Sequence, residues 1–497
     1  MRGSGGLKRF VAAAFVVAFV AASFDNAWTA RTPSITSHVD PSLRAGEVAL
    51  VHTSGGHAGA LSLKLSELGA VDVRTSAAAD TIVARLSAPA LDAVAHDASV
   101  TVATRDIEVV ALDGSRGKGG FERLDNNSGS NNGSRNWTQT GDGITVAVMD
   151  TGIADHPDLL GKVRARIDFV HDSNPLADPG GHGTFIAGLI AANGVMKGVA
   201  PNASLVSLRV LDANGRGMLS SVVAAFNWVL QQGPSTKVDV LNLSWGAPQA
   251  TSYQRDILSA LVEAAWFSGV TVVAASGNDG PTAGSITVPA SDPFVVSVGS
   301  YNDFGTASTL DDVFSTFTAV GPTLDGFLKP DILAPGEHIT SLRAPGVTYL
   351  GADGLPIGLP TDQYIHMTGT SASAGYVSGV AALVAGARWR YSPTQVKGAI
   401  VASARPILGS PAGAVDAANA LVRAPTSVNV GLVPSQALLS ALTSLRRLQV
   451  HGVTWEGVTW DGITWESVSW EAVSWETVSW ETITWEGVTW EDAVSEE

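Results

Sequence analysis

The chain has 497 residues, of which 45% are hydrophobic and 15% charged, so we expect several segments built around a well-packed globular core. The formal net charge is −16, and eleven acidic but no basic residues lie between Gly452 and Glu497. The sequence shows no basic face of the kind that would indicate a nucleic-acid partner. Because the chain has no cysteine, disulfides are excluded and stability must come from the core.

The N-terminus has the pattern of a secretory signal peptide. Three basic residues within the first nine positions precede an apolar run of 13 residues at 10–22, and small residues follow at 21–23. We predict a signal peptide over residues 1–23 and a secreted or cell-envelope location. The run is shorter than the roughly 20 residues that span a bilayer, so an uncleaved anchor is the weaker alternative.

Residues 45–111 are predicted to form a small α+β domain. We expect a β-α-β-β-α-β unit, with strand-like stretches at 47–51, 81–86, 100–107 and 109–110, helical stretches at 58–68 and 88–96, and no stretch assigned to its second strand. Residues 112–135 are rich in Gly, Asn and Ser and include four basic side chains. This composition predicts a flexible linker or processing region that is easily cut.

From Gly143 onwards, short apolar runs alternate with helical patterns. Strands are predicted at 144–149, 204–210, 238–243, 270–275 and 294–298, and helices at 184–192, 219–231 and 253–268. The fold class is therefore α/β, with a mostly parallel β-sheet flanked by helices. In such sheets, sites form at the carboxyl ends of the strands.

Three polar residues follow predicted strands or precede a predicted helix. Asp150 ends one strand, His182 directly precedes a helix of small residues, and Asn278 follows another strand. Taken singly, each has an ordinary explanation: a turn carboxylate, a surface histidine, and an asparagine favoured by turn geometry. Ser371 is the fourth candidate, between a short strand at 364–367 and a buried helix. A helix N-terminus stabilises negative charge there, although Gly-Thr-Ser before a helix is also an ordinary cap.

Taken together, these residues resemble the subtilisin-like serine peptidases over residues 136–421. The matches are Asp-Thr-Gly at 150–152, His-Gly-Thr at 182–184 and Gly-Thr-Ser at 369–371. The resemblance implies that Ser371 is the nucleophile, His182 its general base and Asp150 the carboxylate that orients the imidazole. It also implies that Asn278 donates a hydrogen bond to the oxyanion, with the backbone N–H of Ser371 as second donor.

The resemblance extends to substrate binding. Two extended segments would pair with the peptide as added strands, namely Ser244, Trp245 and Gly246, and Gly215, Arg216 and Gly217. A pocket beside them would have a wall formed by Ala275, Ser276 and Gly277 and a base near Thr287. Trp245 and Met218 would border apolar pockets, although Trp245 is equally compatible with a core position. Val288-Pro289 matches a site where the family often has a cis proline.

Two departures from the family pattern are visible. Ala-Ser-Ala-Gly at 372–375 replaces the usual residues after the serine, and Phe185 replaces a frequent second histidine. Neither removes a catalytic group. No cofactor or metal is required for the chemistry. The loop at 192–198 lacks the insertion that binds calcium in relatives, so structural calcium has no specific motif behind it.

By the same resemblance, residues 45–111 correspond to a propeptide that assists folding and then inhibits the enzyme until it is cleaved. A permanent accessory domain is the alternative. The expected partners are protein or peptide substrates and the chain's own propeptide as an intramolecular inhibitor. Endopeptidase activity is the leading interpretation, with a processing protease of narrow specificity and a catalytically impaired binding or scaffold protein as alternatives.

The C-terminus carries a tandem repeat. After a connector at 422–452, a five-residue unit containing Trp and an acidic residue repeats eight times over 453–492, and residues 493–497 form an acidic end. A five-residue step matches neither the strand nor the helix period. Stacked coils and a flexible acidic tail both remain open. The tryptophans could contact glycan or cell-envelope material, or could associate with one another.

Overall fold

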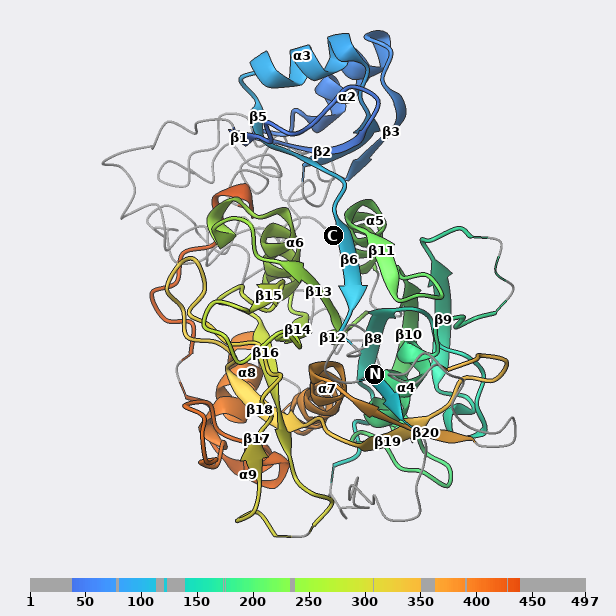
Figure 1. Cartoon of the computed structure of the whole chain (residues 1–497), viewed down its shortest axis with the longest axis vertical. Helices are drawn as coiled ribbons and strands as arrows, with labels where there is room; N and C mark the ends of the chain where they lie inside the picture. Colours follow the sequence, from blue (N-terminus) through green and yellow to red (C-terminus); the bar gives the residue numbers. More distant parts are fainter. Residues whose placement is uncertain are drawn as a thin grey trace, which may run out of the picture.

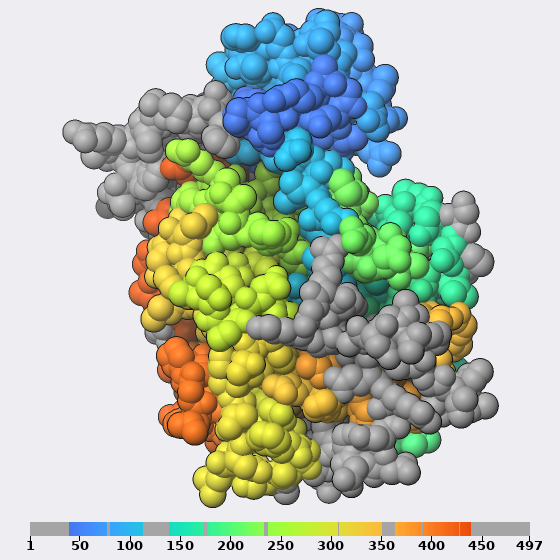
Figure 2. All heavy atoms as spheres, in the orientation of Figure 1, coloured from blue at the N-terminus to red at the C-terminus, as the bar shows by residue number. Residues whose placement is uncertain are grey.

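The computed structural model describes residues 38–76, 80–112, 120–122, 139–172, 174, 176–232, 237–306, 308–349, 363–388, 391–426 and 428–438. The predicted signal peptide, most of the predicted linker and the whole tandem repeat lie outside the described residues. The described chain forms a small N-terminal lobe resting on a larger body (Figure 1). In Figure 2 this lobe is dark blue, and the lighter blue residues after it run onto the green surface of the body.

The N-terminal domain contains one five-stranded sheet, with strand order β1-β5-β2-β4-β3, and two helices. Its elements are β1 (His38–Val39), β2 (Val48–Thr53), α2 (Ala58–Glu67), β3 (Val71–Ser76), β4 (Thr81–Arg85), α3 (Ala88–His96) and β5 (Val100–Arg105). The sequence predicts no strand over β3, whose apolar alternation is confined to Val71 and Val73.

The two faces of strand β2 have different partners. Ala49 and Val51 belong to the small domain's own core, whereas Leu50 belongs to the main core of the body. Successive side chains of a strand point to opposite faces. The sheet therefore covers α2 and α3 with one face and packs on the body with the other.

Strand β6 (Glu108–Ala111) leaves the N-terminal domain. It pairs antiparallel with β11 (Arg216–Met218) on one side and with β13 (Trp245–Pro248) on the other, and β15 (Thr287–Val288) completes this four-stranded sheet. The sequence pattern had placed residues 109–110 with the N-terminal domain. The composition of residues 109–110 does not reveal that the strands they pair with lie in the body.

The body is built on an eight-stranded sheet whose main path has the order β17-β16-β14-β12-β8-β10-β9, with β18 also paired to β16. The strands are β8 (Thr145–Asp150), β9 (Val163–Asp168), β10 (Ser204–Arg209), β12 (Val240–Leu243), β14 (Thr271–Ala275), β16 (Val296–Asn302), β17 (Val313–Phe314) and β18 (Ile332–Pro335). Every pairing is parallel except that of β16 with β17. The predicted fold class is confirmed.

Helices cover both faces of this sheet (Figure 1). They are α4 (His182–Ala191), α5 (Leu219–Leu230), α6 (Ile257–Phe267), α7 (Thr370–Ala387), α8 (Pro393–Ala402) and α9 (Ala417–Val422), with 3-10 turns η2 (Pro157–Leu159) and η3 (Tyr253–Arg255). A fourth sheet joins β19 (Ile339–Leu342), β20 (Tyr364–Thr368) and β7 (Gly120–Glu122). Among the described helices, only α7 is long and apolar enough to span a membrane. It is 78% buried in the body and serves as a core helix.

Helix α8 carries a buried lysine. The Nζ of Lys397 donates to the carbonyl oxygens of Pro293 and Val295 at 2.9 Å and lies 3.2 Å from a carboxylate oxygen of Asp331. Burial lowers the pKa of Lys397 to about 7, against the opposing effect of Asp331.

Candidate active site

Asp150 and His182 meet at the carboxyl end of the central sheet. Asp150 is the last residue of β8 and His182 the first residue of α4, and both are buried. The Nδ1 of His182 donates to Oδ1 of Asp150 at 2.8 Å, and the N–H of Thr151 donates to the same oxygen at 2.7 Å. Since Nδ1 carries the proton, Nε2 of the neutral imidazole is an acceptor.

Two glycines allow these loops to approach each other. A Cβ on Gly183 would lie 2.0 Å from the carbonyl oxygen of Gly152. A Cβ on Gly152, whose φ is +123°, would lie 2.0 Å from the carbonyl oxygen of Ala177. Any side chain at either position would force the backbones apart. The glycines of the two motifs are therefore required by the contact between the loops.

Asp178 is a buried residue that the sequence analysis missed. Its Oδ1 accepts from the Thr151 hydroxyl and the Gly181 N–H, both at 2.7 Å. Its Oδ2 accepts from the N–H of Thr184 at 2.7 Å and from the Thr184 hydroxyl at 2.5 Å. Burial raises the pKa of Asp178 despite these donors. The Asp178 carboxylate thus joins the Asp150 loop to both flanks of His182. Its position four residues before His182 is the sequence feature that could have indicated this role.

Asn278 and the N-terminus of α7 form the opposite side of the site. Oδ1 of Asn278 accepts from both the N–H and the hydroxyl of Thr370 at 2.9 Å. These bonds orient the amide so that Nδ2 faces outward, where it donates to the carbonyl oxygen of Leu112 at 2.6 Å. The Ser371 hydroxyl, next to Thr370, donates to the carbonyl oxygen of Ser244 at 2.9 Å.

The chain's own residues 108–112 lie in this site as an added strand. The N–H of Ala111 donates to the carbonyl oxygen of Gly215 at 2.8 Å, and the N–H of Leu112 donates to that of Ser244 at 3.1 Å. In the strand register, Trp245 lies opposite Ala111 and Gly246 opposite Val110. On the other side, Arg216 pairs with Val110 and Gly217 with Val109. Two of the segments predicted to bind substrate thus flank a peptide strand.

The predicted pocket residues also come together beside this strand. The Thr287 hydroxyl donates to the carbonyl oxygen of Ser276 at 3.1 Å. A Cβ on Gly246 would lie 2.6 Å from Oγ1 of Thr287, and one on Gly277 would lie 2.9 Å from its Cγ2. Ala275, the last residue of β14, is fully buried. The Val288-Pro289 peptide bond is cis.

Comparison with known proteins identifies the family. Residues 141–433 match the model of the subtilase family. The chain belongs to the subtilase family. It is 38% identical over 273 residues to the serine protease AprX of Bacillus subtilis (strain 168), covering 52% of this chain and 61% of AprX. It is 35% identical over 315 residues to an alkaline protease of Alkalihalobacillus alcalophilus, covering 63% and 70% of the two chains. The predicted resemblance is confirmed at the level of the family.

A solved structure extends the likeness of the fold. Fervidolysin from Fervidobacterium pennivorans superposes with a TM-score of 0.60 and 22% identity, covering 81% of this chain and 65% of that one. The matched share of this chain is larger than the subtilase region of residues 141–433, so the likeness of the fold extends beyond that region.

Of the two side chains predicted to border pockets in this subtilase, one lies in the core. Trp245 is fully buried, and its Nε1 donates to the carbonyl oxygen of Met149 at 2.8 Å. Its backbone borders the bound strand, whereas its side chain fills the space behind it. Met218 is 40% exposed and lines a cleft between the lobes.

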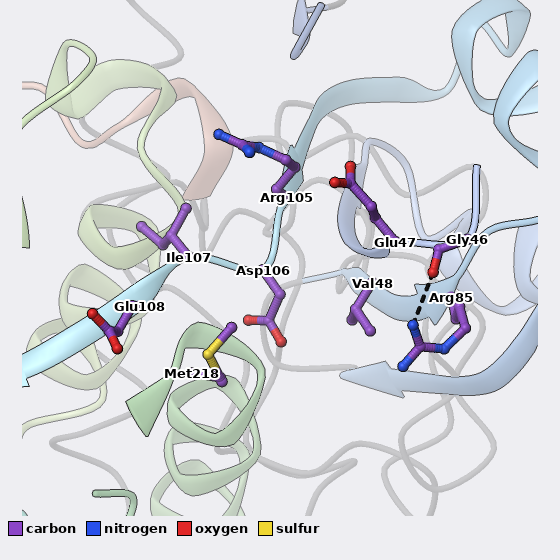
Figure 3. Close-up of a pocket in the computed structure, with 9 residues that line it drawn as sticks. All are labelled: Gly46, Glu47, Val48, Arg85, Arg105, Asp106, Ile107, Glu108 and Met218. Carbon is purple, nitrogen blue, oxygen red and sulfur yellow. Dashed lines mark hydrogen bonds between the residues drawn. The ribbon is translucent and has the colours of Figure 1, made fainter. Parts of the chain in front are cut away.

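That cleft marks the junction of the N-terminal domain with the body (Figure 3). It has a volume of about 640 Å³ and is lined by Gly46, Glu47, Val48, Arg85, Arg105, Asp106, Ile107, Glu108 and Met218. The Asp106 carboxylate accepts from the N–H and the hydroxyl of Ser220, at 2.8 and 2.6 Å. Ser220 lies in the first turn of α5, where free N–H groups favour an anion. Burial nevertheless raises the pKa of Asp106.

The departures from the common subtilase pattern have a packing explanation. Phe185 is fully buried, and its carbonyl oxygen accepts from the Ser341 hydroxyl at 2.6 Å. A Cβ on Gly375 would already lie 3.3 Å from a methyl carbon of Ile186. Glycine here lets α7 approach α4 closely, so the helices that begin at Thr370 and His182 pack against each other.

The loop after α4 does not suit a cation. The Asp158 carboxylate accepts from the N–H groups of Val195 and Met196 at 3.0 and 2.9 Å. The ammonium group of Lys197 donates to the side-chain oxygen of Asn193. Protein donors therefore already use the oxygens that a calcium ion would need. Among the described residues, we also find no group of three or more His, Asp or Glu side chains that could hold a metal.

Proposed function

We propose that this subtilase is a secreted serine endopeptidase, made as a precursor in which the N-terminal domain is an inhibitory propeptide. One observation carries the proposal. The carbonyl oxygen of Leu112 accepts a hydrogen bond from Asn278 Nδ2 at 2.6 Å, while residues 108–111 lie between β11 and β13. The chain's own peptide is bound as a substrate would be, with its carbonyl group beside an oxyanion donor.

In the proposed reaction, the Ser371 hydroxyl attacks the carbonyl carbon that precedes the scissile bond. The Ser371 hydroxyl, which donates to the Ser244 carbonyl oxygen at 2.9 Å, would have to turn to His182 Nε2, which takes the proton. Asp150 then stabilises the imidazolium through its 2.8 Å hydrogen bond to Nδ1. Asn278 Nδ2 and the N–H of Ser371 donate to the oxyanion.

The acyl-enzyme forms as the imidazolium returns its proton to the leaving amine and the peptide bond breaks. Water, activated by the same imidazole, then hydrolyses the ester and releases Ser371. No cofactor enters these steps. For the precursor itself, the reaction would cut between Leu112 and Asp113 and leave the N-terminal domain, up to Leu112, as a non-covalent inhibitor.

Further contacts support the precursor assignment. Asp106 anchors the N-terminal domain to the first turn of α5, and Arg216 Nη1 donates to Oε1 of Glu108 in the bound strand at 2.9 Å. Secretion rests on the basic and apolar pattern before residue 23. Mature substrates would bind by backbone pairing to β11 and β13, which accepts many sequences. Contact of the tandem repeat with glycan or cell-envelope material remains a prediction.

The test is labelling with a fluorophosphonate, which reacts only with an activated serine. The wild-type chain should be labelled after it has matured, whereas Ser371→Ala should not be. Ser373→Ala is the matched control, because this neighbouring serine is also buried on α7 but bonds to the Ala334 carbonyl oxygen. Intact mass and N-terminal sequencing should place the new terminus at Asp113. A correctly processed chain that is never labelled would contradict the proposal and favour a silent binding protein.

A further inference from the structure

The last described segment of the chain lies between the body and the N-terminal domain. Residues 433–438 run beside α6, beneath the N-terminal sheet (Figure 1). Tyr253, in η3, donates its hydroxyl to the carbonyl oxygen of Val433 at 2.8 Å. We call residues 435–438 the docking segment.

A buried carboxylate holds the docking segment on the body. Glu263 on α6 is fully buried, and its Oε2 accepts from the N–H and the hydroxyl of Ser435, at 2.8 and 2.6 Å. The N–H of Gln436 donates to Oε1 of Gln254 at 3.2 Å. The first half of the segment is therefore tied to the body.

The second half contacts the N-terminal domain. Nε2 of His52, in β2, lies 2.8 Å from the carbonyl oxygen of Ala437, and His52 is 1% exposed. A carbonyl oxygen only accepts, so Nε2 carries the proton of this bond. Nδ1 then accepts from the Thr81 hydroxyl at 3.2 Å in the neutral ring. This bond joins residues 385 positions apart in the sequence.

Apolar burial accompanies the bond. Ala437 and Leu438 are both 2% exposed and belong to the main core of the body. Leu50, two residues before His52 on the same face of β2, belongs to that same core and not to the core of its own domain. The docking segment is thus enclosed where the outer face of the N-terminal sheet meets the body.

We propose that the docking segment is an interaction surface for the propeptide, so that part of the hold on the propeptide comes from the C-terminal end of the chain. This rests on the proposed function only in treating residues 38–112 as a propeptide that separates from the body. The segment stays anchored to Glu263, and departure of the propeptide breaks the bond between His52 and Ala437. The base of the C-terminal tail is therefore covered in the precursor and uncovered by maturation.

The experiment uses the full-length Ser371→Ala chain with a site for an unrelated, site-specific protease placed within residues 113–119. After cutting, the rate at which the propeptide dissociates is followed by size-exclusion chromatography. His52→Ala should accelerate dissociation about tenfold, because it leaves the buried Ala437 carbonyl without its donor. His96→Ala is the matched control, since its side chain is 77% exposed in the same domain.

A second variant tests the other side of the contact without altering the propeptide. Leu438→Ala should also accelerate dissociation about tenfold, whereas Val430→Ala, at a position 77% exposed, should not. Combining His52→Ala with Leu438→Ala should give less than the product of the two effects, because both disrupt one contact. Dissociation at the control rate in either single variant, or effects that multiply fully, would overturn the proposal. Since the chain is inactive by design, this result is independent of fluorophosphonate labelling.

Discussion

Replacing Asp178 by asparagine tests how the His182 loop is held. The substitution keeps the shape of the side chain but removes one acceptor oxygen. In the native site, each carboxylate oxygen accepts one backbone N–H and one threonine hydroxyl. Whichever way the amide turns, its NH₂ group faces a backbone N–H that cannot rotate away. A buried donor is then left unpaired.

The structure sets the size of the effect. An unpaired buried donor costs about 1–3 kcal/mol of the free energy of unfolding. The affected N–H groups belong to Gly181 and Thr184, which flank His182, so the displacement falls on the imidazole. A shift of about 1 Å in a catalytic group lowers the rate about 100-fold. We therefore expect Asp178→Asn to lower kcat by about 10- to 100-fold with KM nearly unchanged.

The assay measures kcat and KM of the matured chain on a peptide substrate, together with the free energy of unfolding in the Ser371→Ala background. Asp416→Asn is the matched control, because Asp416 caps α9 and asparagine caps a helix equally well. A native kcat in Asp178→Asn would refute the reasoning. So would a loss of activity explained entirely by a smaller folded fraction, because Asp178 would then stabilise the fold without positioning His182.

Three further outcomes are expected. Asp106→Ala should weaken binding of the cut propeptide about 10-fold or more by removing a helix cap, whereas Asp92→Ala, 78% exposed, should not, as measured by inhibition constants. Gly183→Ala should abolish self-cleavage by separating the catalytic loops, seen as an unprocessed chain by mass. Burial disfavours the charged form of Lys397 and lowers its pKa to about 7 in the fold. The resulting loss in the free energy of unfolding is therefore largest below pH 7 and decreases as the pH rises toward 10.5, the ordinary pKa of lysine. Lys397→Met in the Ser371→Ala background should flatten this rise in denaturation experiments between pH 7.5 and 10, and an unchanged slope would contradict it.

Five strands of the central sheet could be predicted because each has a recognisable local sequence pattern. β8, β10, β12, β14 and β16 are short, largely buried apolar runs. β9, β17 and β18 were not predicted, and the residues of β9 alternate between partly buried and exposed. The strand predicted at 144–149 is β8, which ends at Asp150, and that at 270–275 is β14, which leads to Asn278. Parallel strands bring their carboxyl ends to one edge, so the convergence of these residues followed from topology.

Other parts of the site depend on distant pairings that leave no local pattern. Asp178 has the sequence context of any loop carboxylate: three of its donors are local, on Gly181 and Thr184, but the fourth, the Thr151 hydroxyl, comes from the other loop. Asp106 likewise acquires its role from Ser220, which lies 114 residues further along the chain. The core position of the Trp245 side chain was also undecided, because strand alternation does not indicate which face of a short edge strand meets the core.

In the proposed precursor, strand β6 would be both ligand and inhibitor. Without it, β11 and β13 would present unpaired N–H and C=O groups on facing edges, which is a template for any extended peptide. With it, those edges are filled, and the Leu112 carbonyl lies beside Asn278 Nδ2 in the position of a bond to be cut. Cleavage after Leu112 would leave every one of these backbone hydrogen bonds intact, since they all lie on the N-terminal side of the cut. In the proposed precursor, inhibition would therefore outlast the covalent link, with the propeptide held by these strand hydrogen bonds together with contacts such as that of Asp106 with Ser220.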